Sequence, residues 1–275
     1  MIVSPFTPLF FIDHKTDGID CGYVQTFAVT DRILLELIGS SGDDVSAQVI
    51  EERSGTPLCQ IVFNEWAVNE DTVLKFASIS LSPGLYSVEI SGIGKSEPFM
   101  VTDDGMTLAD TVLIQYSMKN NRQRNDAVFF IDGMQYFFDF RVHGGFKDSN
   151  WSFGVENEQF VTPNSDISQL FGLESTQKKF TLGCSSGVPV WFGEMLNRIL
   201  VCSHVYFDGV KYTRKDAAVP EMNVALEGVN SFVFTQSLQQ SVNLDPIIEQ
   251  RNHLIMRRVG SAGYRRSYDG INRKI

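Results

Sequence analysis

Clusters of turn-forming residues divide the first hundred residues into short apolar segments. The clusters are Gly39-Ser40-Ser41-Gly42-Asp43-Asp44, Ser54-Gly55-Thr56-Pro57, Ser82-Pro83-Gly84 and Gly92-Ile93-Gly94. Because glycine reaches positive φ without steric cost and proline presets a turn, these clusters are physical breaks in the chain. Short strands at this spacing are typical of a β-sandwich. The predicted strands are Phe27–Ile38, Val45–Ile50, Leu58–Phe63, Val73–Ser80, Leu85–Ile90 and Pro98–Val101.

The segment from Ser82 to Ile90 is similar to the corner and following strand of an immunoglobulin-like sandwich. In such a corner a tyrosine hydroxyl bonds back to the backbone a few residues upstream, and Tyr86 would take that place. A plain strand that contains a tyrosine is the alternative. We predict a mainly β protein that begins with an immunoglobulin-like β-sandwich domain over residues 1–102.

A second, β-rich domain with one short helix is predicted over residues 103–250, after Asp103-Asp104-Gly105. Asp132-Gly133 and Asp208-Gly209 lie between apolar segments and predict two hairpins. Apolar residues spaced near 3.6 predict a helix at 189–200, and Pro189 suits its first turn. Polar, aromatic and glycine residues from Gly144 to Gly172 predict a long loop with a short strand. Further strands are expected at Thr111–Tyr116, Lys178–Leu182 and Ser231–Leu238.

Charge is distributed unevenly along the chain. The net charge is −10, but residues 251–275 carry +6, which leaves −16 on residues 1–250. The acidic balance argues against a protein whose whole surface binds nucleic acid. The basic C-terminal arm is either a solvated terminus or a segment that docks on an acidic surface, for example that of a neighbouring copy. The predicted contact residues are Arg257, Arg258, Tyr264, Arg265, Arg266 and Tyr268.

Four cysteines, Cys21, Cys59, Cys184 and Cys202, form no Cys-x-x-Cys pair. Buried free thiols in a reducing cytoplasm are the favoured interpretation, and two disulfides are the alternative if the protein is exported. No apolar run reaches the roughly 18 residues that a membrane span needs, and no secretory signal is expected. Scattered histidines and the absence of nucleotide motifs predict neither a metal site nor a cofactor.

One pattern matches a serine hydrolase. Gly183-Cys184-Ser185-Ser186-Gly187 fits G-x-S-x-G between a predicted strand and a predicted helix, and His143-Gly144-Gly145 could build an oxyanion hole. The possible partners downstream are Asp208, Asp216, Glu227 and His253. A chance match is expected in roughly one such chain in six, and the fold of such hydrolases needs a parallel sheet with several crossover helices. We therefore predict no catalytic residues and place the hydrolase, through Ser185, third among the functions.

Several segments resemble tail or baseplate-type virion proteins of phages and prophages of Bacteroides-type gut bacteria, crAss-like phages included. They are Gly84–Ile90, Ser96–Val101, Val112–Ser117, Gly187–Trp191, Leu196–Cys202 and Phe207–Tyr212. The resemblance implies a non-catalytic subunit of a tail or neck ring, present in many copies. Its expected partners are other copies of itself and neighbouring tail, neck or portal proteins, with no sequence-specific nucleic acid. Its expected location is the virion, after synthesis and assembly in the bacterial host cytoplasm.

The alternative function is a glycan- or receptor-binding β-sandwich module. Trp66, Trp151 and Trp191 could supply the flat apolar surfaces on which sugar rings stack. A ring repeats one heterologous interface until the rotation closes, whereas a binding module needs an exposed platform of fixed geometry.

Overall fold

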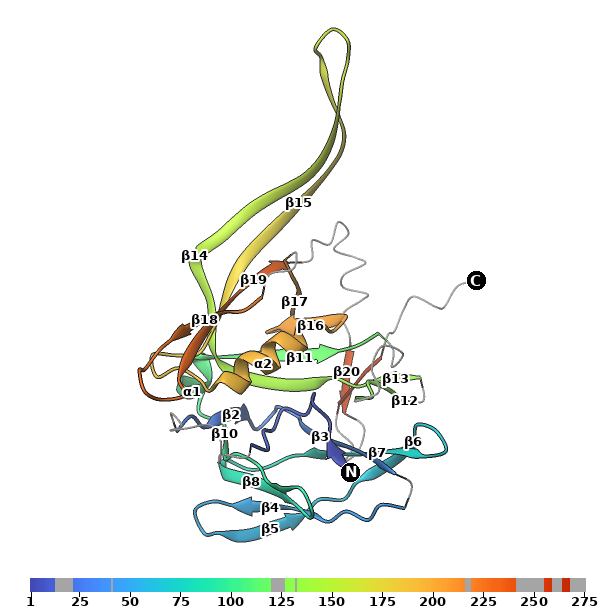
Figure 1. Cartoon of the computed structure of the whole chain (residues 1–275), viewed down its shortest axis with the longest axis vertical. Helices are drawn as coiled ribbons and strands as arrows, with labels where there is room; N and C mark the ends of the chain where they lie inside the picture. Colours follow the sequence, from blue (N-terminus) through green and yellow to red (C-terminus); the bar gives the residue numbers. More distant parts are fainter. Residues whose placement is uncertain are drawn as a thin grey trace.

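The computed structural model contains two β-rich units and one long hairpin (Figure 1). It describes residues 1–12, 22–40, 42–119, 127–131, 133–215, 219–240, 255–258 and 264–267. The sandwich lies at the bottom in Figure 1, the second unit lies above it, and the hairpin rises from the second unit. The protein is therefore mainly β, with a sandwich followed by a β-rich unit, as predicted.

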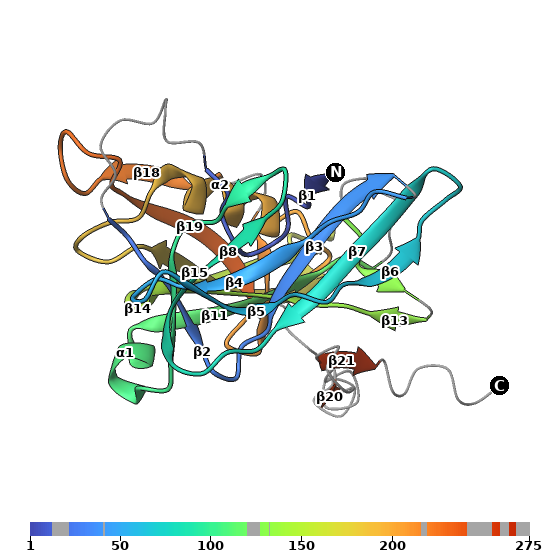
Figure 2. The same cartoon turned by 90° about the horizontal axis from the view of Figure 1, so that it is seen from below.

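Two sheets form the N-terminal sandwich, and seen from below β3, β7 and β6 run side by side (Figure 2). The first sheet has the order β1-β3-β7-β6. The second has the order β2-β10-β8-β4-β5, with β9 paired to β8. The strands are β1 (Ile2–Val3), β2 (Gln25–Ala28), β3 (Ile33–Ser40), β4 (Ala47–Glu51), β5 (Thr56–Gln60), β6 (Asn64–Ala67), β7 (Thr72–Ile79), β8 (Gly84–Ile90), β9 (Gly94–Lys95) and β10 (Phe99–Thr102).

This strand order is that of an immunoglobulin-like sandwich. Taken in the order in which they pair, β1-β3-β7-β6 correspond to strands A, B, E and D, and β10-β8-β4-β5 correspond to G, F, C and C′. β2 adds to the second sheet through its parallel pairing with β10. The predicted strand Phe27–Ile38 is wrong in one respect, because a turn at 29–32 divides it into β2 and β3, which belong to different sheets.

The tyrosine corner is present. The Tyr86 hydroxyl donates to the Ser82 carbonyl at 3.1 Å, and the side chain is buried. A Cβ at Gly84 would lie 2.5 Å from that hydroxyl, so the corner requires glycine there. In antibody domains the residue two positions after this tyrosine is a disulfide cysteine, whereas here it is Val88, fully buried in the sandwich core. Apolar packing takes the place of the disulfide.

The second unit is a closed antiparallel barrel. Its sheet has the order β15-β14-β11-β16-β17-β19, and β15 also pairs with β19, which closes it. β18 pairs with β19 beyond β17. Closure leaves none of these six strands as a free edge along its barrel-forming part. The strands are β11 (Thr111–Ser117), β14 (Phe138–Val161), β15 (Ile167–Leu182), β16 (His204–Phe207), β17 (Val210–Arg214), β18 (Glu221–Val224) and β19 (Phe232–Gln240).

Both predicted hairpins form. Asp208 and Gly209 connect β16 to β17 with φ of 46° and 82°, the positive values that a two-residue hairpin turn requires. β12 (Phe130–Ile131) pairs with β13 (Met134–Gln135) around Gly133, and Asp132 lies outside the described residues. This second hairpin is shorter than predicted, because β14 begins only at Phe138 and pairs with β11 instead.

The predicted helix is α2 (Val190–Ile199), which follows Pro189. Its buried face packs between the barrel and the N-terminal segment: Phe192 contacts the rings of Phe140 and Phe10. A Cβ on Gly193 would lie 2.4 Å from the Phe234 ring, so glycine lets the helix approach the barrel this closely. A second short helix, α1 (Gly105–Ala109), was not predicted. It begins where the Asp104 carboxylate accepts hydrogen bonds from two backbone amides.

Sandwich and barrel are joined by buried contacts. Asp31, in the turn after β2, forms a bidentate ion pair with Arg141 of β14 at 2.5 and 2.9 Å. The Tyr116 hydroxyl donates to the Phe6 carbonyl at 2.5 Å, and Phe6 and Leu34 belong to the same apolar cluster as the barrel interior. The division at residues 102 and 103 stays a prediction, and the two units share one core.

The predicted loop from Gly144 to Gly172 is wrong. Most of it belongs to β14 and β15, which pair in register from Gly144↔Leu182 to Val161↔Ile167, with irregularities after Phe146 and Glu158. A two-stranded ribbon satisfies its own backbone hydrogen bonds, so polar and glycine residues do not prevent it from forming. The C-terminal strands β20 (Ile255–Arg258) and β21 (Tyr264–Ser267) form another hairpin beside β13.

Candidate functional site

The most prominent surface feature is the distal part of the β14–β15 hairpin, residues 153–175, which we call the arm. Below it, β14 pairs with β11 up to His143, and β15 pairs with β19 from Thr176 to Leu182. Within the arm the two strands pair only with each other. In Figure 1 the arm extends beyond every other part of the described chain.

The tip of the arm is a defined turn. The amide of Thr162 donates to the Asp166 carbonyl at 2.8 Å, and the amide of Asp166 donates back to the Thr162 hydroxyl at 3.1 Å. Ser165 takes a φ of 63° to complete the turn. A structured tip holds the two strands in register as far as Val161 and Ile167.

Large apolar side chains are exposed along the arm. Each has between 53% and 79% of its surface accessible: Phe153, Val155, Phe160, Val161, Ile167 and Leu170. Alternate residues of a strand point to opposite faces, so Phe153 and Val155 lie on one face and Phe160 on the other. An apolar surface of this kind is typical of a protein–protein contact.

The arm is also acidic. Residues 153–175 contain Glu156, Glu158, Asp166 and Glu174 and neither lysine nor arginine. Its net charge is therefore −4. Exposed apolar and acidic side chains together favour a partner surface that is basic and partly apolar.

A small hollow at the root of the arm has the opposite charge. Its volume is about 280 Å³, and three lysines contribute to its wall. The Lys178 ammonium lies 3.8 Å from the centroid of the Trp151 ring. Among the described residues, no carboxylate pairs with these lysines. The lining residues are Trp151, Ser152, Gln177, Lys178, Lys179, Lys215 and Ser237.

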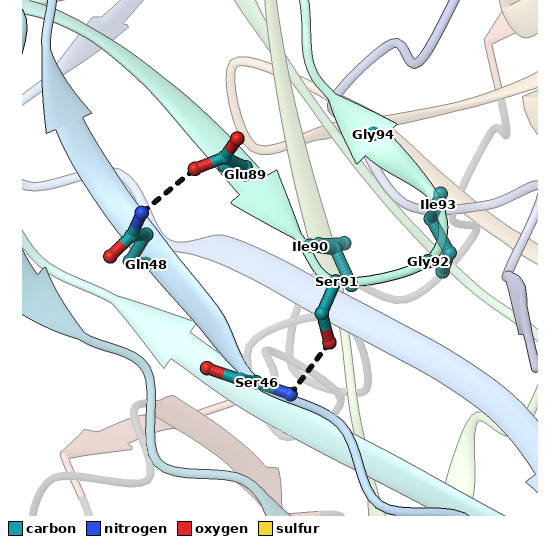
Figure 3. Close-up of a pocket in the computed structure, with 8 residues that line it drawn as sticks. All are labelled: Ser46, Gln48, Glu89, Ile90, Ser91, Gly92, Ile93 and Gly94. Carbon is teal, nitrogen blue, oxygen red and sulfur yellow. Dashed lines mark hydrogen bonds between the residues drawn. The ribbon is translucent and has the colours of Figure 1, made fainter.

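A larger hollow of about 540 Å³ lies on the sandwich, beside the turn between β8 and β9 (Figure 3). The Gln48 amide donates to the Glu89 carboxylate at 2.7 Å, and the Ser46 amide donates to the Ser91 hydroxyl at 3.1 Å. Ile90 and Ile93 line it, but no aromatic ring does. It lacks the stacking platform that sugar recognition commonly uses, and its polar groups bond to one another.

The predicted contact residues of the basic segment fall on β20 and β21. Arg257 and Arg258 lie on β20, and Tyr264, Arg265 and Arg266 lie on β21, where Arg266 pairs with Gln135 of β13. Tyr268 lies outside the described residues. The basic segment therefore forms two short strands, where the charge pattern predicted only a basic arm.

The hydrolase residues are brought together only in part. The Gly183 amide donates to the His143 carbonyl at 2.9 Å, so the two glycine-containing segments are neighbours. The His143 ring bonds to the Tyr23 hydroxyl at 3.0 Å, and burial lowers the pKa of His143. The Asp208 carboxylate accepts from the Leu113 amide. Ser185 and Glu227 are exposed, and Asp216 and His253 lie outside the described residues.

The cysteines correct one expectation. Cys202 is a buried free thiol, as predicted, but Cys59 and Cys184 are free and exposed. Cys21 lies outside the described residues. Within the described chain no group of three or more His, Cys, Asp or Glu side chains could hold a metal ion. Neither described helix has the length and apolar character needed to cross a membrane.

The three tryptophans have different environments. Trp191 is 7% exposed in the barrel core, and Trp66 is partly buried against a smaller apolar cluster. Trp151, at the root of the arm, is 46% exposed. Of the three platforms considered for glycan binding, Trp151 is the most exposed, with the Lys178 ammonium 3.8 Å from the centroid of its ring.

Comparison with known proteins adds little to this geometry. No family model matches the chain, and no curated protein matches it. One similar solved structure is described as "Crystal structure of Dpr2 Ig1-Ig2 in complex with DIP-Theta Ig1-Ig3". It is 8% identical, with 83% of this chain and 90% of that chain covered, at a TM-score of 0.18. A score this low supports no argument, so the class of the protein, an immunoglobulin-like sandwich joined to a barrel with an arm, rests on its own strand order.

Proposed function

We propose that this protein is a structural subunit of a bacteriophage tail or neck that assembles as a homo-oligomeric ring and contacts neighbouring virion proteins. The observation that carries the proposal is the arm, an exposed ribbon with six accessible large apolar side chains. The phage setting rests on the sequence resemblance, and so does the expected place in the virion.

The energetics of the arm favour a partner. An isolated two-stranded ribbon is marginally stable in water, so it gains from packing against another surface. Burial of one large apolar side chain stabilises by roughly 1.5–3 kcal/mol, and several are available on the arm. The total for several buried side chains is comparable to the roughly 4–15 kcal/mol that association costs in lost translational and rotational freedom.

The shape of the molecule suits a head-to-tail contact. The arm lies at one end of the molecule (Figure 1), and a contact between the arm of one copy and the body of the next would be heterologous. Such heterologous contacts generate rings when the rotation closes and filaments when it does not. The residues predicted to contact a neighbour through the basic segment, Arg257 to Tyr268, would add a second contact between acidic bodies and basic strands.

The test is light scattering after size exclusion, at two salt concentrations, on the full chain and on a variant with a shortened arm. The variant replaces residues 153–176 by Asn-Gly, which suits a two-residue hairpin between the paired residues Ser152 and Gln177. The full chain should associate as its concentration rises, and the variant should remain monomeric with an unchanged near-ultraviolet circular dichroism spectrum.

Negative-stain electron microscopy of the associated fraction then checks closure, since rings of uniform diameter are expected. Filaments would contradict closure, and association unchanged by shortening would contradict the role of the arm. Deletion of residues 251–275 tests the basic segment separately. If the truncated chain assembles normally at both salt concentrations, that segment has no part in assembly.

A glycan-binding function is the second candidate, and the exposed ring of Trp151 is the observation that favours it. Its hollow also contains Ser152 and Gln177, whose side chains bond to each other at 3.2 Å, and the Gln177 amide nitrogen is a further donor for sugar hydroxyls. A glycan array with the full chain and with Trp151→Ala tests this function. Binding that is lost in the variant would support it, and an array without hits would exclude the glycans tested.

A further inference from the structure

We infer that the acidic arm of one copy docks against the lysine-lined hollow at the arm root of the next copy. This inference rests on the proposed ring and names the contact that would build it. The hollow is the one lined by Lys178, Lys179 and Lys215. The occupant is residues 153–175 of a second copy of the same chain.

The arm and the hollow carry opposite charges. The arm carries four carboxylates without a lysine or arginine. The lining of the hollow contains three lysines without an aspartate or glutamate. In a chain of net charge −10 such a basic hollow is a local exception, and it faces no carboxylate partner among the described residues. Complementary patches of this kind steer association and fix its register.

The root of the arm also offers an apolar surface. The root of the arm presents Trp151, 46% exposed, with the Lys178 ammonium above its ring. Lys178 also lies 5.8 Å from the ring centroid of Tyr212. Apolar side chains near the tip of the arm, such as Phe160 and Ile167, could pack on the exposed part of the Trp151 ring while arm carboxylates reach the ammonium groups. Trp151 and Lys178 form a cross-strand pair, so their side chains lie on the face of the ribbon opposite to Lys179, and this apolar surface adjoins the lysine-lined hollow.

Geometry requires that the arm come from another copy. Ten residues separate Trp151 from Val161 along β14, a length of about 33 Å at 3.3 Å per residue. β14 and β15 stay paired over this length, so the tip is held away from its own root (Figure 1). Contact between the tip and the root of the same chain would require the ribbon to break, whereas contact between copies needs only translation and rotation. A repeat of that contact places each arm along the root of its neighbour.

Charge reversal on each surface tests the inference. One double variant changes the hollow, Lys179→Glu with Lys215→Glu. Another changes the arm, Glu158→Lys with Glu174→Lys. Sedimentation at low salt measures the concentration at which half of the protein is assembled. Each double variant should raise that concentration at least tenfold, and the combination of all four substitutions should return it to within threefold of the unaltered chain.

The matched control is Glu70→Lys with Asp71→Lys, which makes the same charge change as the arm variant at an exposed turn of the sandwich. It should assemble normally. Thermal unfolding of every variant checks that the barrel remains folded. Losses that simply add in the fourfold variant would show that the two surfaces do not meet, and would overturn the inference.

The remaining outcomes separate this inference from the proposed function. If the shortened arm abolishes assembly but the charge reversals do not affect it, the arm docks elsewhere and this inference alone fails. If the hollow variant assembles normally but loses binding of inorganic phosphate, the hollow is a small-anion site and the inference fails. A full chain that is monomeric at every concentration overturns both.

Discussion

The two strands β14 and β15 have opposite environments along their length. We call the rest of these two strands, residues 138–152 and 176–182, the root. In the root, Phe140, Val142, Phe180 and Leu182 are completely buried in the barrel. In the arm, Phe153 is 79% exposed and Val155 is 65% exposed. The backbone pairing continues through both parts. The difference shows that strand formation here depends on local pairing, whereas burial depends on whether other strands and α2 are present to cover a face.

The root is further distinguished by its polar contacts. Arg141 and Asp139 project from β14 toward the sandwich, where they bind the Asp31 carboxylate and the Arg32 amide. In the arm, the hydrogen bonds of the tip turn join Thr162 to Asp166 of the same ribbon. The root therefore belongs to the folding unit that includes the sandwich.

The largest difference expected in this comparison is between the loss of a buried ring at the root and the loss of an exposed ring in the arm. Phe180→Ala removes a ring packed against Phe146 and Phe207 and should lower the free energy of unfolding by about 3–5 kcal/mol. Phe153→Ala should change it by less than about 0.5 kcal/mol, since the ring is exposed, yet weaken association. Urea unfolding of both variants checks this, and equal losses would contradict the distinction.

Removal of the ion pair that joins the root to the sandwich should have an effect nearly as large. Asp31→Ala leaves the Arg141 guanidinium without its bidentate partner, and the Asp31 side chain is 1% exposed. Breaking a buried pair in this way costs about 3–5 kcal/mol. Urea denaturation measures the loss, and Asp103→Ala, at an exposed position, is the control. A loss below about 1 kcal/mol would show that the pair does not join the two units.

A smaller, pH-dependent effect is expected from Asp139 on the root. Burial raises the pKa of this carboxyl, against hydrogen bonds from Gln115 and the Arg32 amide that lower it. The folded protein then holds the proton to higher pH than the unfolded chain, whose carboxyl has a pKa near 3.9. The contribution of Asp139 to the free energy of unfolding should fall as pH rises from about 3.9 through the raised value.

Carbon-detected nuclear magnetic resonance can follow the Asp139 carboxyl directly. A midpoint above about 3.9, the pKa of an aspartate in an unfolded chain, would confirm the direction of the shift. A midpoint at or below that value would contradict it, because it would mean that the hydrogen bonds outweigh burial.

The smallest effect is expected at the boundary between root and arm. Lys178→Met removes the cation above the Trp151 ring and keeps most of the aliphatic side chain. A cation–π contact at a partly exposed site contributes about 0.5–1 kcal/mol. Urea unfolding should show a loss in that range, and Lys211→Met on β17 serves as the control. A gain in stability would show that repulsion among Lys178, Lys179 and Lys215 outweighs the cation–π contact.

The arm and its hollow were missed from the sequence for identifiable reasons. Alternation of Trp151, Phe153 and Val155 with smaller or polar residues was a strand signal, and Pro163-Asn164-Ser165 was a turn signal. The glycines and polar residues of the same segment favoured a loop. Hydrophobic periodicity detects strands that bury one face, so it does not identify a ribbon whose two strands pair with each other and are exposed. Lys215 is distant in sequence from Lys178 and Lys179, and it meets them only because β15 and β17, which Lys215 follows, both pair with β19.

The sequence by itself indicated the sandwich strands β4, β7, β8 and β10, the Asp208-Gly209 hairpin and the helix after Pro189, and it offered the tyrosine corner as one of two interpretations, but it missed β1, β6 and β9. Each depends on local chemistry: turn residues with defined φ, a short side-chain bond to the backbone, and a periodic apolar face. Closure of the barrel, the joining of sandwich and barrel through Asp31, and the exposure of the arm were decided by tertiary structure. These features depend on which distant strands pair, and the free energy of such long-range contacts is not encoded in any short segment of the chain.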